Sequence, residues 1–329
     1  MTQNGNAPFP RYIASTVFVD FLGRGRGPLL NPSGNGILLV FAMVSMLMLV
    51  PRAGRWGRIV LLVALGVYLM GIHSTLTRCA WMGGVGALGL LILIVLPKFW
   101  RLPAILSTAM ALVLVVGANW DRLVAFKRDK NVSIEDMKES ASLRPILAVV
   151  AWKMFQDYPV FGCGIGHYLK SATVYLNDRD VDMVLEKVRP YIQHNIFLSL
   201  LTETGLVGLS VFTALIGIWI LHAWRLWCRE SLPLEFRQVG LVFLGTLTAY
   251  FANGMFQDVL VIPMVNMYLF FLAGLVQNLA GKTTQVVARQ TNSLQRLVTP
   301  VAHFQYASAA VDRPYGSAKV ATGDRLGES

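Results

Sequence analysis

The sequence predicts an all-α polytopic integral membrane protein, with about seven transmembrane helices and one long extracytoplasmic loop that contains amphipathic helices. Composition is the first observation behind this prediction. Of the 329 residues, 55% are hydrophobic and only 14% are charged, whereas a soluble domain carries about 25% charged residues. Long apolar runs separated by short basic loops are the second observation. Together they exclude a disordered, collagen-like or disulfide-rich secreted protein.

The charge of the chain is strongly positive, with a net value of +11 and a pI of about 9.8. Many of the lysines and arginines flank apolar runs. This is the positive-inside pattern of membrane proteins rather than the solvated basic face that binds nucleic acid. We therefore expect membrane lipids, and no nucleic acid, among the partners of the chain.

Metal and cofactor motifs are missing from the sequence. The three cysteines, Cys79, Cys163 and Cys228, lie far apart and form no CxxC pair, so they predict neither a disulfide framework nor a metal site. His167 and His194 lack the spacing of metal ligands, and no Walker, HExxH or nucleophile-elbow motif occurs. We expect no metal ion and no other cofactor.

Seven apolar runs approach the roughly 20 residues that a helix needs to cross a bilayer. The third run is rich in glycine, which we interpret as a surface for close helix packing. The runs are residues 34–50, 59–73, 80–96, 102–119, 206–224, 239–256 and 259–279.

The loops between these runs predict the orientation. Several arginines and lysines follow the first, third, fifth and seventh runs. The other short loops are poorer in charge: Arg78 is the one charged residue between the second and third runs, and Asp258 is the one between the sixth and seventh. The positive-inside rule then places the C-terminus in the cytoplasm. With seven spans, the N-terminus lies outside.

This topology divides the chain into five parts. Residues 1–33 are a polar N-terminal segment, 34–119 contain transmembrane helices 1–4, and 120–193 are the extracytoplasmic loop. Residues 194–280 contain transmembrane helices 5–7, and 281–329 are a disordered cytoplasmic tail.

One amphipathic helix is expected within the long loop, over residues 142–158. Pro159 and a glycine-rich stretch end it. Apolar side chains recur at helical spacing on one face, and these are Leu143, Ile146, Leu147, Val150 and Met154.

Two arginines are candidates for binding an anion. Arg78 lies at the outer end of the third run, where it is either a snorkelling anchor or a ligand for an anionic group. Arg144 lies at the start of the loop helix, where it is either a solvated charge or a phosphate ligand. Arginine presents a planar fork of donors that matches phosphate, so two of them near one membrane face suit a diphosphate.

His194 is the candidate general base, because it lies where the long loop re-enters the membrane and its ordinary pKa suits proton transfer near neutral pH. The alternative is a structural hydrogen-bonding role. Glu203 lies in an apolar stretch and needs a partner, which is either an arginine or the backbone at a break near Gly205. Together with Asn195, it is expected to give structural support.

In the order and spacing of these residues, the chain resembles the O-antigen ligase and O-antigen polymerase family of bacterial polysaccharide assembly, over about residues 26–279. Four stretches carry the resemblance, two of them weak alone and two specific together. They are Arg26-Gly-Pro-Leu-Leu-Asn-Pro, Thr75-Leu-Thr-Arg-Cys-Ala-Trp, the stretch from Arg144 through Trp152 to Asp157-Tyr-Pro-Val-Phe-Gly-Cys-Gly-Ile-Gly, and His194-Asn-Ile-Phe-Leu-Ser-Leu-Leu-Thr-Glu-Thr-Gly. Cys79 replaces the glycine usual in this family.

The resemblance implies a multi-pass membrane glycosyltransferase of the bacterial inner (cytoplasmic) membrane, with its long loop in the periplasm. Such an enzyme transfers a glycan from an undecaprenyl-diphosphate donor to an acceptor hydroxyl, on an acceptor glycolipid or a growing polysaccharide. It uses no nucleotide and no metal. The resemblance also implies that Arg78 and Arg144 bind the diphosphate and that His194 activates the acceptor.

Three alternatives stay open. The motifs do not separate lipid core ligation from polysaccharide polymerisation or transfer to protein, and they leave the oligomeric state undefined. A transporter or flippase for a lipid-linked glycan would use the same arginines. A catalytically inactive truncated structural subunit is the third, since family members have further spans before the first matching stretch and we expect this chain to be the C-terminal part of a larger unit.

Overall fold

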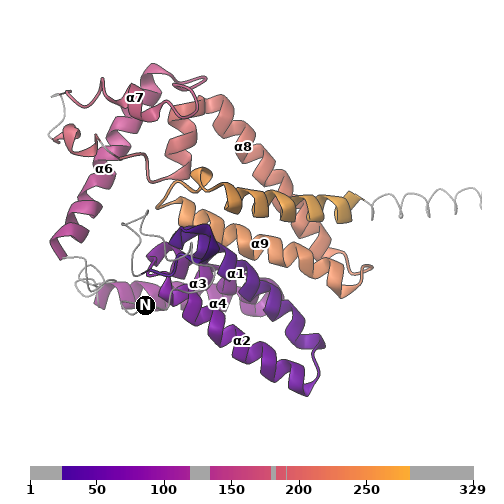
Figure 1. Ribbon diagram of the computed structural model, residues 1–329. Coiled ribbons are helices and arrows are strands. Elements are labelled where there is room, and N and C mark those ends of the chain that lie inside the picture. The colour runs from indigo at the N-terminus through magenta and orange to yellow at the C-terminus, as the bar shows by residue number, and fades with distance from the viewer. Residues whose placement is uncertain (1–23, 119–133, 179–182, 190, 282–329) are drawn as a thin grey trace, which may run out of the picture. The chain divides into compact units, whose positions relative to one another are not determined.

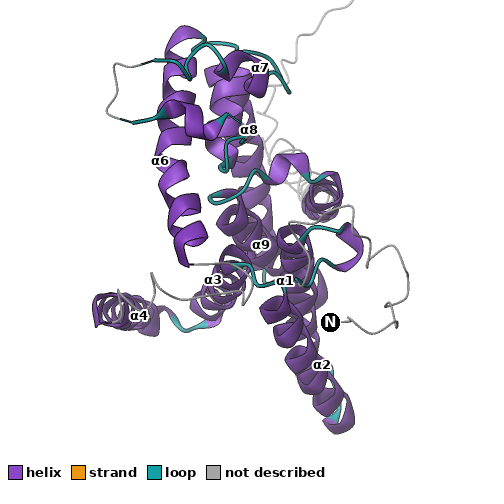
Figure 2. Cartoon of the chain, turned by 60° about the vertical axis from the view of Figure 1, so that its left-hand side comes forward, coloured by secondary structure: helices purple, strands orange, loops and turns teal. Residues whose placement is uncertain are grey.

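The computed structural model describes residues 24–118, 134–178, 183–189 and 191–281, and these residues form helices and loops without strands (Figures 1 and 2). The chain divides into two compact units, residues 1–280 and 281–329. The predictions for residues 1–23, 119–133 and 282–329 lie outside the described residues.

The helices follow the apolar runs, and their ends are set by proline, glycine and polar capping side chains. They are α1 (Pro32–Leu49), α2 (Arg55–Ser74), α3 (Arg78–Val95), α4 (Lys98–Ala118), α6 (Ile134–Asp157), α7 (Tyr168–Ala172), α8 (Ile196–Cys228) and α9 (Leu234–Gly254), followed by a helix over Pro263–Gly281. The described residues also contain four 3-10 turns, η3 (Gly27–Leu29) before α1, η4 (Val50–Arg52), η5 (Leu185–Val188) and η6 (Val259–Val261).

Five helices in the described residues are long and apolar enough to cross a membrane: α1 with its 3-10 extension, α2, α3, α8 and the helix Pro263–Gly281. The helices α4 and α9 occupy the other two predicted positions. α9 begins with Glu235, Arg237 and Gln238, which lower its mean hydropathy, and the side chains of α4 from residue 111 onward lie outside the description. The all-α class is confirmed, and the count of seven spans stays a prediction.

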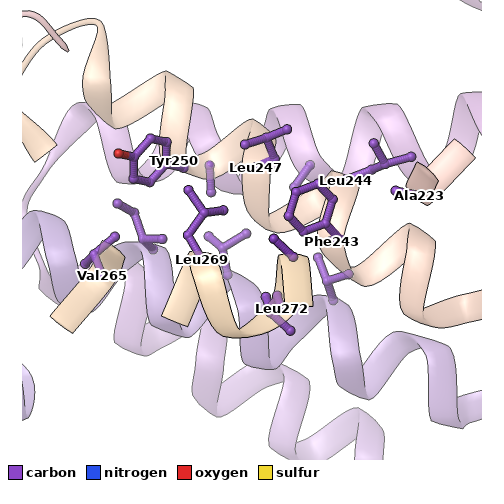
Figure 3. Packing of buried hydrophobic residues seen from close by; sticks show 14 of the residues in the cluster. Ala223, Phe243, Leu244, Leu247, Tyr250, Val265, Leu269 and Leu272 are labelled. Atoms are coloured by element: carbon purple, nitrogen blue, oxygen red, sulfur yellow. The ribbon is translucent and has the colours of Figure 1, made fainter. Parts of the chain in front are cut away.

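The main core is built around α9, which packs against α1, α3 and α8. Figure 3 shows residues of α9 facing the helix Pro263–Gly281 and Ala223 of α8. Close contact depends on small residues: a Cβ on Gly240 would overlap the carbonyl of Ala223, and one on Gly83 would lie 3.0 Å from the Cα of Ala249. The glycine-rich run of α3 therefore packs against a neighbouring helix, as expected for membrane helices.

A second, smaller core is formed by residues that lie between α4 and α8 in the sequence. The helix predicted over residues 142–158 corresponds to the second part of α6, which ends at Asp157, and all five residues of its predicted apolar face are buried. They contact apolar residues of α7 and η5. This segment therefore has a hydrophobic cluster of its own, made by α6, α7 and η5.

The fifth apolar run differs most from its prediction, because α8 begins at Ile196 rather than near residue 206. The side chain of Asn195 caps this start by accepting hydrogen bonds from the backbone N–H groups of Phe197 and Leu198, at 2.9 and 3.1 Å. The helix is then broken at Gly205, whose φ of 64° and ψ of −162° are not helical. Figure 1 shows the two parts of α8 running in different directions on either side of this break.

Candidate functional site

One end of the helix bundle carries Arg78 and the segment of His194 and Asn195, and Arg144 of α6 contacts it. We call it the site end, and define it by the starts of α1, α3 and α8, the ends of α2 and α9, and the connection 255–262. Hydrogen bonds join these pieces: Ser33 of α1 donates to Gln257, and the Asn195 amide donates to the carbonyl of Met255 at 3.1 Å. Residues from distant parts of the chain therefore share one surface.

Arg78 lies in the first turn of α3 at this end. Its position is set by Thr77, the N-cap residue, which is buried and accepts a 2.6 Å hydrogen bond from Arg24. The two residues after Arg78, Cys79 and Ala80, are buried against α1, while Arg78 itself is exposed. Packing of its neighbours thus leaves the Arg78 side chain on the surface of the site end.

Arg144 reaches the site end from α6. Its guanidinium carbon lies 5.2 Å from the centre of the Phe256 ring, in the connection after α9. Its charge also acts on the thiol of Cys79 and on the imidazole of His194. Arg144 therefore lies within electrostatic reach of Cys79, the residue that follows Arg78 in the chain, and of His194.

His194 immediately precedes the cap of α8 and is half-buried. Its ring lies 6.4 Å from the ring of Tyr191, centre to centre. Burial and, second, the positive charge of Arg144 hold the pKa of His194 below its ordinary value, because both disfavour the charged imidazolium. A neutral imidazole can accept a proton, which a general base requires.

The neighbours of His194 attach this segment to the bundle. The preceding residue, Gln193, is buried and donates to the Thr202 hydroxyl at 2.5 Å. On the other side, Asn195 both caps α8 and donates to Met255. The backbone around His194 is therefore held on both sides by buried or capping contacts.

Asp258 is a residue of this site that sequence reasoning did not select. It is buried, accepts a 2.6 Å hydrogen bond from Ser199 of α8 and caps η6 by accepting from the N–H of Leu260 at 3.0 Å. Burial raises the pKa of its carboxyl, and the Ser199 and Leu260 hydrogen bonds oppose that rise. The signal was present in the sequence, because an acid between two apolar runs needs a partner.

Glu203 lies next to the break in α8. Its carboxylate accepts a 3.0 Å hydrogen bond from the N–H of Gly166, and its charge also acts on Asp258. The described partner of Glu203 is thus the backbone of Gly166, in the turn between α6 and α7, whereas the sequence suggested an arginine or the backbone at Gly205. Its role in the reaction stays a prediction.

Candidate metal ligands do not gather in the described part of the chain, where no group of three His, Cys, Asp or Glu side chains could hold an ion. The three described cysteines are free thiols. That the reaction is independent of metal stays a prediction.

Comparison with known proteins identifies the family of this region. A family model described as O-Antigen ligase matches residues 63–213, a range that contains Arg78, Arg144, His194 and the break of α8 at Gly205. The resemblance inferred from the sequence is therefore confirmed, and with it an association with membranes and polysaccharide biosynthesis. No curated protein matches the chain.

Proposed function

Because residues 63–213 carry the O-antigen ligase family domain, we propose that this protein transfers a glycan from an undecaprenyl-diphosphate donor to an acceptor hydroxyl. The family is one of membrane glycosyltransferases that act on lipid-linked glycans and polysaccharides. The acceptor is a glycolipid core in ligation, or a growing polysaccharide in polymerisation.

The observation that carries this proposal is the position of Arg144. Its charge acts on both His194 and Cys79, the neighbour of Arg78. This supports a site in which His194 acts as the base and the guanidinium groups of Arg78 and Arg144 act on the same substrate. A donor with its diphosphate on Arg78 and Arg144 would present its sugar near His194.

Electrostatics at the site end supports an anionic substrate. The helices α1, α3 and α8 all begin there, and a helix N-terminus carries a partial positive charge. Arginine adds charge without having to lose a proton, so it stabilises a diphosphate both in the donor and as a leaving group.

The proposed reaction is a single displacement at the anomeric carbon of the donor. The neutral His194 imidazole takes the proton of the acceptor hydroxyl, and the hydroxyl oxygen forms a bond to the anomeric carbon. The bond from that carbon to the diphosphate oxygen breaks, and its electron pair leaves with the lipid diphosphate, whose charge Arg78 and Arg144 stabilise. The proton on His194 is then released to water.

The orientation of the site follows from the same proposal. The opposite end of the bundle carries Arg52, Arg55 and Arg58 before and within α2, and Arg237 on α9. The positive-inside rule assigns that end to the cytoplasm. The site end would then face the periplasm of the bacterial inner membrane, where a flipped lipid-linked glycan is presented.

Two experiments test the proposal. Purified full-length protein in lipid vesicles is given an undecaprenyl-diphosphate-linked oligosaccharide and a glycolipid acceptor; we expect a glycosylated acceptor and free undecaprenyl diphosphate. Glycan analysis of cells that lack the gene then distinguishes loss of attachment from loss of polymer length. Movement of the intact donor across the bilayer without any transfer would instead identify a transporter, and an unchanged glycan profile would identify an inactive subunit; either overturns the proposal.

A further inference from the structure

We infer that the turn Tyr158–Gly166, between α6 and α7, is immersed beside α8 in the lipid of the periplasmic leaflet of the inner membrane. This turn contains no charged residue. It exposes three large apolar residues to solvent: Val160 is 50% exposed, Phe161 is 73% exposed and Ile165 is 79% exposed. Contiguous exposed apolar side chains of this kind mark an interaction surface rather than a surface in water.

The turn is attached to the broken part of α8 through its backbone. The N–H of Cys163 donates to the carbonyl of Thr202 at 2.8 Å, and the N–H of Leu206 donates back to the carbonyl of Pro159 at 2.9 Å. Glycines make this approach fit, because a Cβ on Gly162 or on Gly205 would overlap the backbone of the opposite segment. The exposed side chains are therefore held at a defined place rather than on a free loop.

Backbone pairing also suits an apolar surrounding. Irregular backbone is tolerated at membrane depth only where its polar groups have partners within the protein. The N–H groups of Gly162, Cys163 and Gly164 all donate to carbonyl oxygens. The N–H of Gly166 donates to the Glu203 carboxylate, which gives that half-buried charge a partner as well.

Continuity with α8 identifies lipid as the occupant. α8 is one of the five helices long and apolar enough to cross a membrane. Its exposed apolar surface begins beside the turn, at Leu206, Val207 and Val211, and the N–H of Val207 donates to Val160. The apolar surface of the turn therefore extends the lipid-facing surface of α8. An uncharged, aromatic and aliphatic surface at the end of a spanning helix fits the acyl and headgroup boundary of the bilayer.

The surroundings of the turn mark the limit of this surface. Asp157 precedes it, and His167 and Lys170 follow it. Farther along, Val184 is also 61% exposed, but it lies beside the exposed ion pair of Glu186 and Arg189. We expect Val184 to face water, which makes it the control for the turn. Immersion of the turn would fix the level of α6, and so of Arg144, relative to the membrane.

The test uses spin labels on full-length protein in vesicles of phosphatidylethanolamine and phosphatidylglycerol. Cys79, Cys163 and Cys228 are replaced by alanine, and Ile165→Cys or Val184→Cys supplies the single label. We expect a label at residue 165 to collide several-fold more often with oxygen than with a water-soluble nickel chelate, and a label at 184 to show the reverse. A Phe161→Cys variant repeats the measurement should Ile165→Cys fold poorly.

Three results would overturn the inference. Equal access of the nickel chelate to residues 161, 165 and 184 would show that the turn lies in water. Low access of both oxygen and the chelate to residue 165 would show that protein covers it. Protection that disappears when the protein is diluted in lipid would identify a second copy of the chain as the occupant. The inference rests on the orientation proposed above and requires α8 to cross the bilayer, but it does not require the proposed reaction, so inactive protein serves equally well.

Discussion

The guanidinium of Arg144 lies over the aromatic ring of Phe256, with 5.2 Å between the guanidinium carbon and the ring centre. The two residues come from α6 and from the connection after α9. The residue before Phe256, Met255, accepts a hydrogen bond from Asn195, which directly follows His194. One short connection therefore contacts both the segment of the candidate base and the candidate diphosphate ligand.

This relationship predicts that Phe256→Leu weakens donor binding more than it slows the chemical step. A cation–π contact at an exposed site contributes about 0.5–1 kcal/mol. Its loss corresponds to a rise of roughly two- to fivefold in the KM for the lipid donor. Phe256→Trp, which keeps an aromatic face, should restore wild-type KM. Steady-state kinetics with a varied donor concentration measures both variants. An equal KM for Leu and Trp would show that the ring does not hold Arg144.

His194→Ala should abolish glycan transfer while the amount of protein in the membrane stays near normal. His194 is half-buried at a helix start whose cap is made by Asn195 rather than by the histidine, so the fold does not depend on its ring. Removing a general base typically costs a factor of roughly 10² to 10⁴. Transfer assays and quantitative immunoblots on the same membranes check this. Full activity in the variant would remove His194 from the mechanism.

Arg144→Lys and Arg78→Lys should each reduce transfer strongly. Lysine keeps the charge but loses the planar fork that binds two phosphate oxygens together. The matched control is Arg55→Lys, because Arg55 is exposed at the start of α2, at the opposite end of the bundle. That control should behave as wild type. A lysine variant that transfers normally would show that its arginine acts only as a point charge or an anchor.

The pH dependence of transfer should report the interaction between Arg144 and His194. Arg144 lowers the pKa of His194 together with burial. Removing the positive charge in Arg144→Gln therefore raises this pKa toward its ordinary value. Since the base acts in its neutral form, the acidic limb of the pH profile of kcat/KM should move to higher pH. An acidic limb that stays in place would show that a group other than His194 controls it.

Residue 177 should face the outside of the cell. Asn177 is exposed between α7 and η5, on the loop that the charge pattern assigns to the periplasm. In a background without the three native cysteines, Asn177→Cys should react with a membrane-impermeant thiol reagent in spheroplasts. Ser231→Cys, exposed between α8 and α9, should react only after lysis. The reverse pattern would invert the topology and place the site away from a flipped donor.

The sequence alone was sufficient for features that depend on local order along the chain. Helical periodicity identified the buried face of α6, because side chains such as Leu147 and Val150 repeat at the pitch of one helix. Apolar runs bounded by proline, glycine and arginine located the helices α1, α2 and α3 within a few residues. The resemblance to a family could also be inferred, since its motifs are short stretches that follow one another in order, and the family match over residues 63–213 confirms this resemblance.

The tertiary structure decided what depends on contacts between distant segments. The break of α8 at Gly205 accompanies the close approach of the turn Tyr158–Gly166 to the backbone of α8. The contact of Arg144 with Phe256, and the burial of Asp258 against Ser199, join elements far apart in the chain. A single sequence carries no distance between such residues. These residues come together only when α6, α8 and the connection after α9 pack against one another. That packing is driven by burial of the apolar faces of the helices, and the polar residues near the helix ends meet as a consequence.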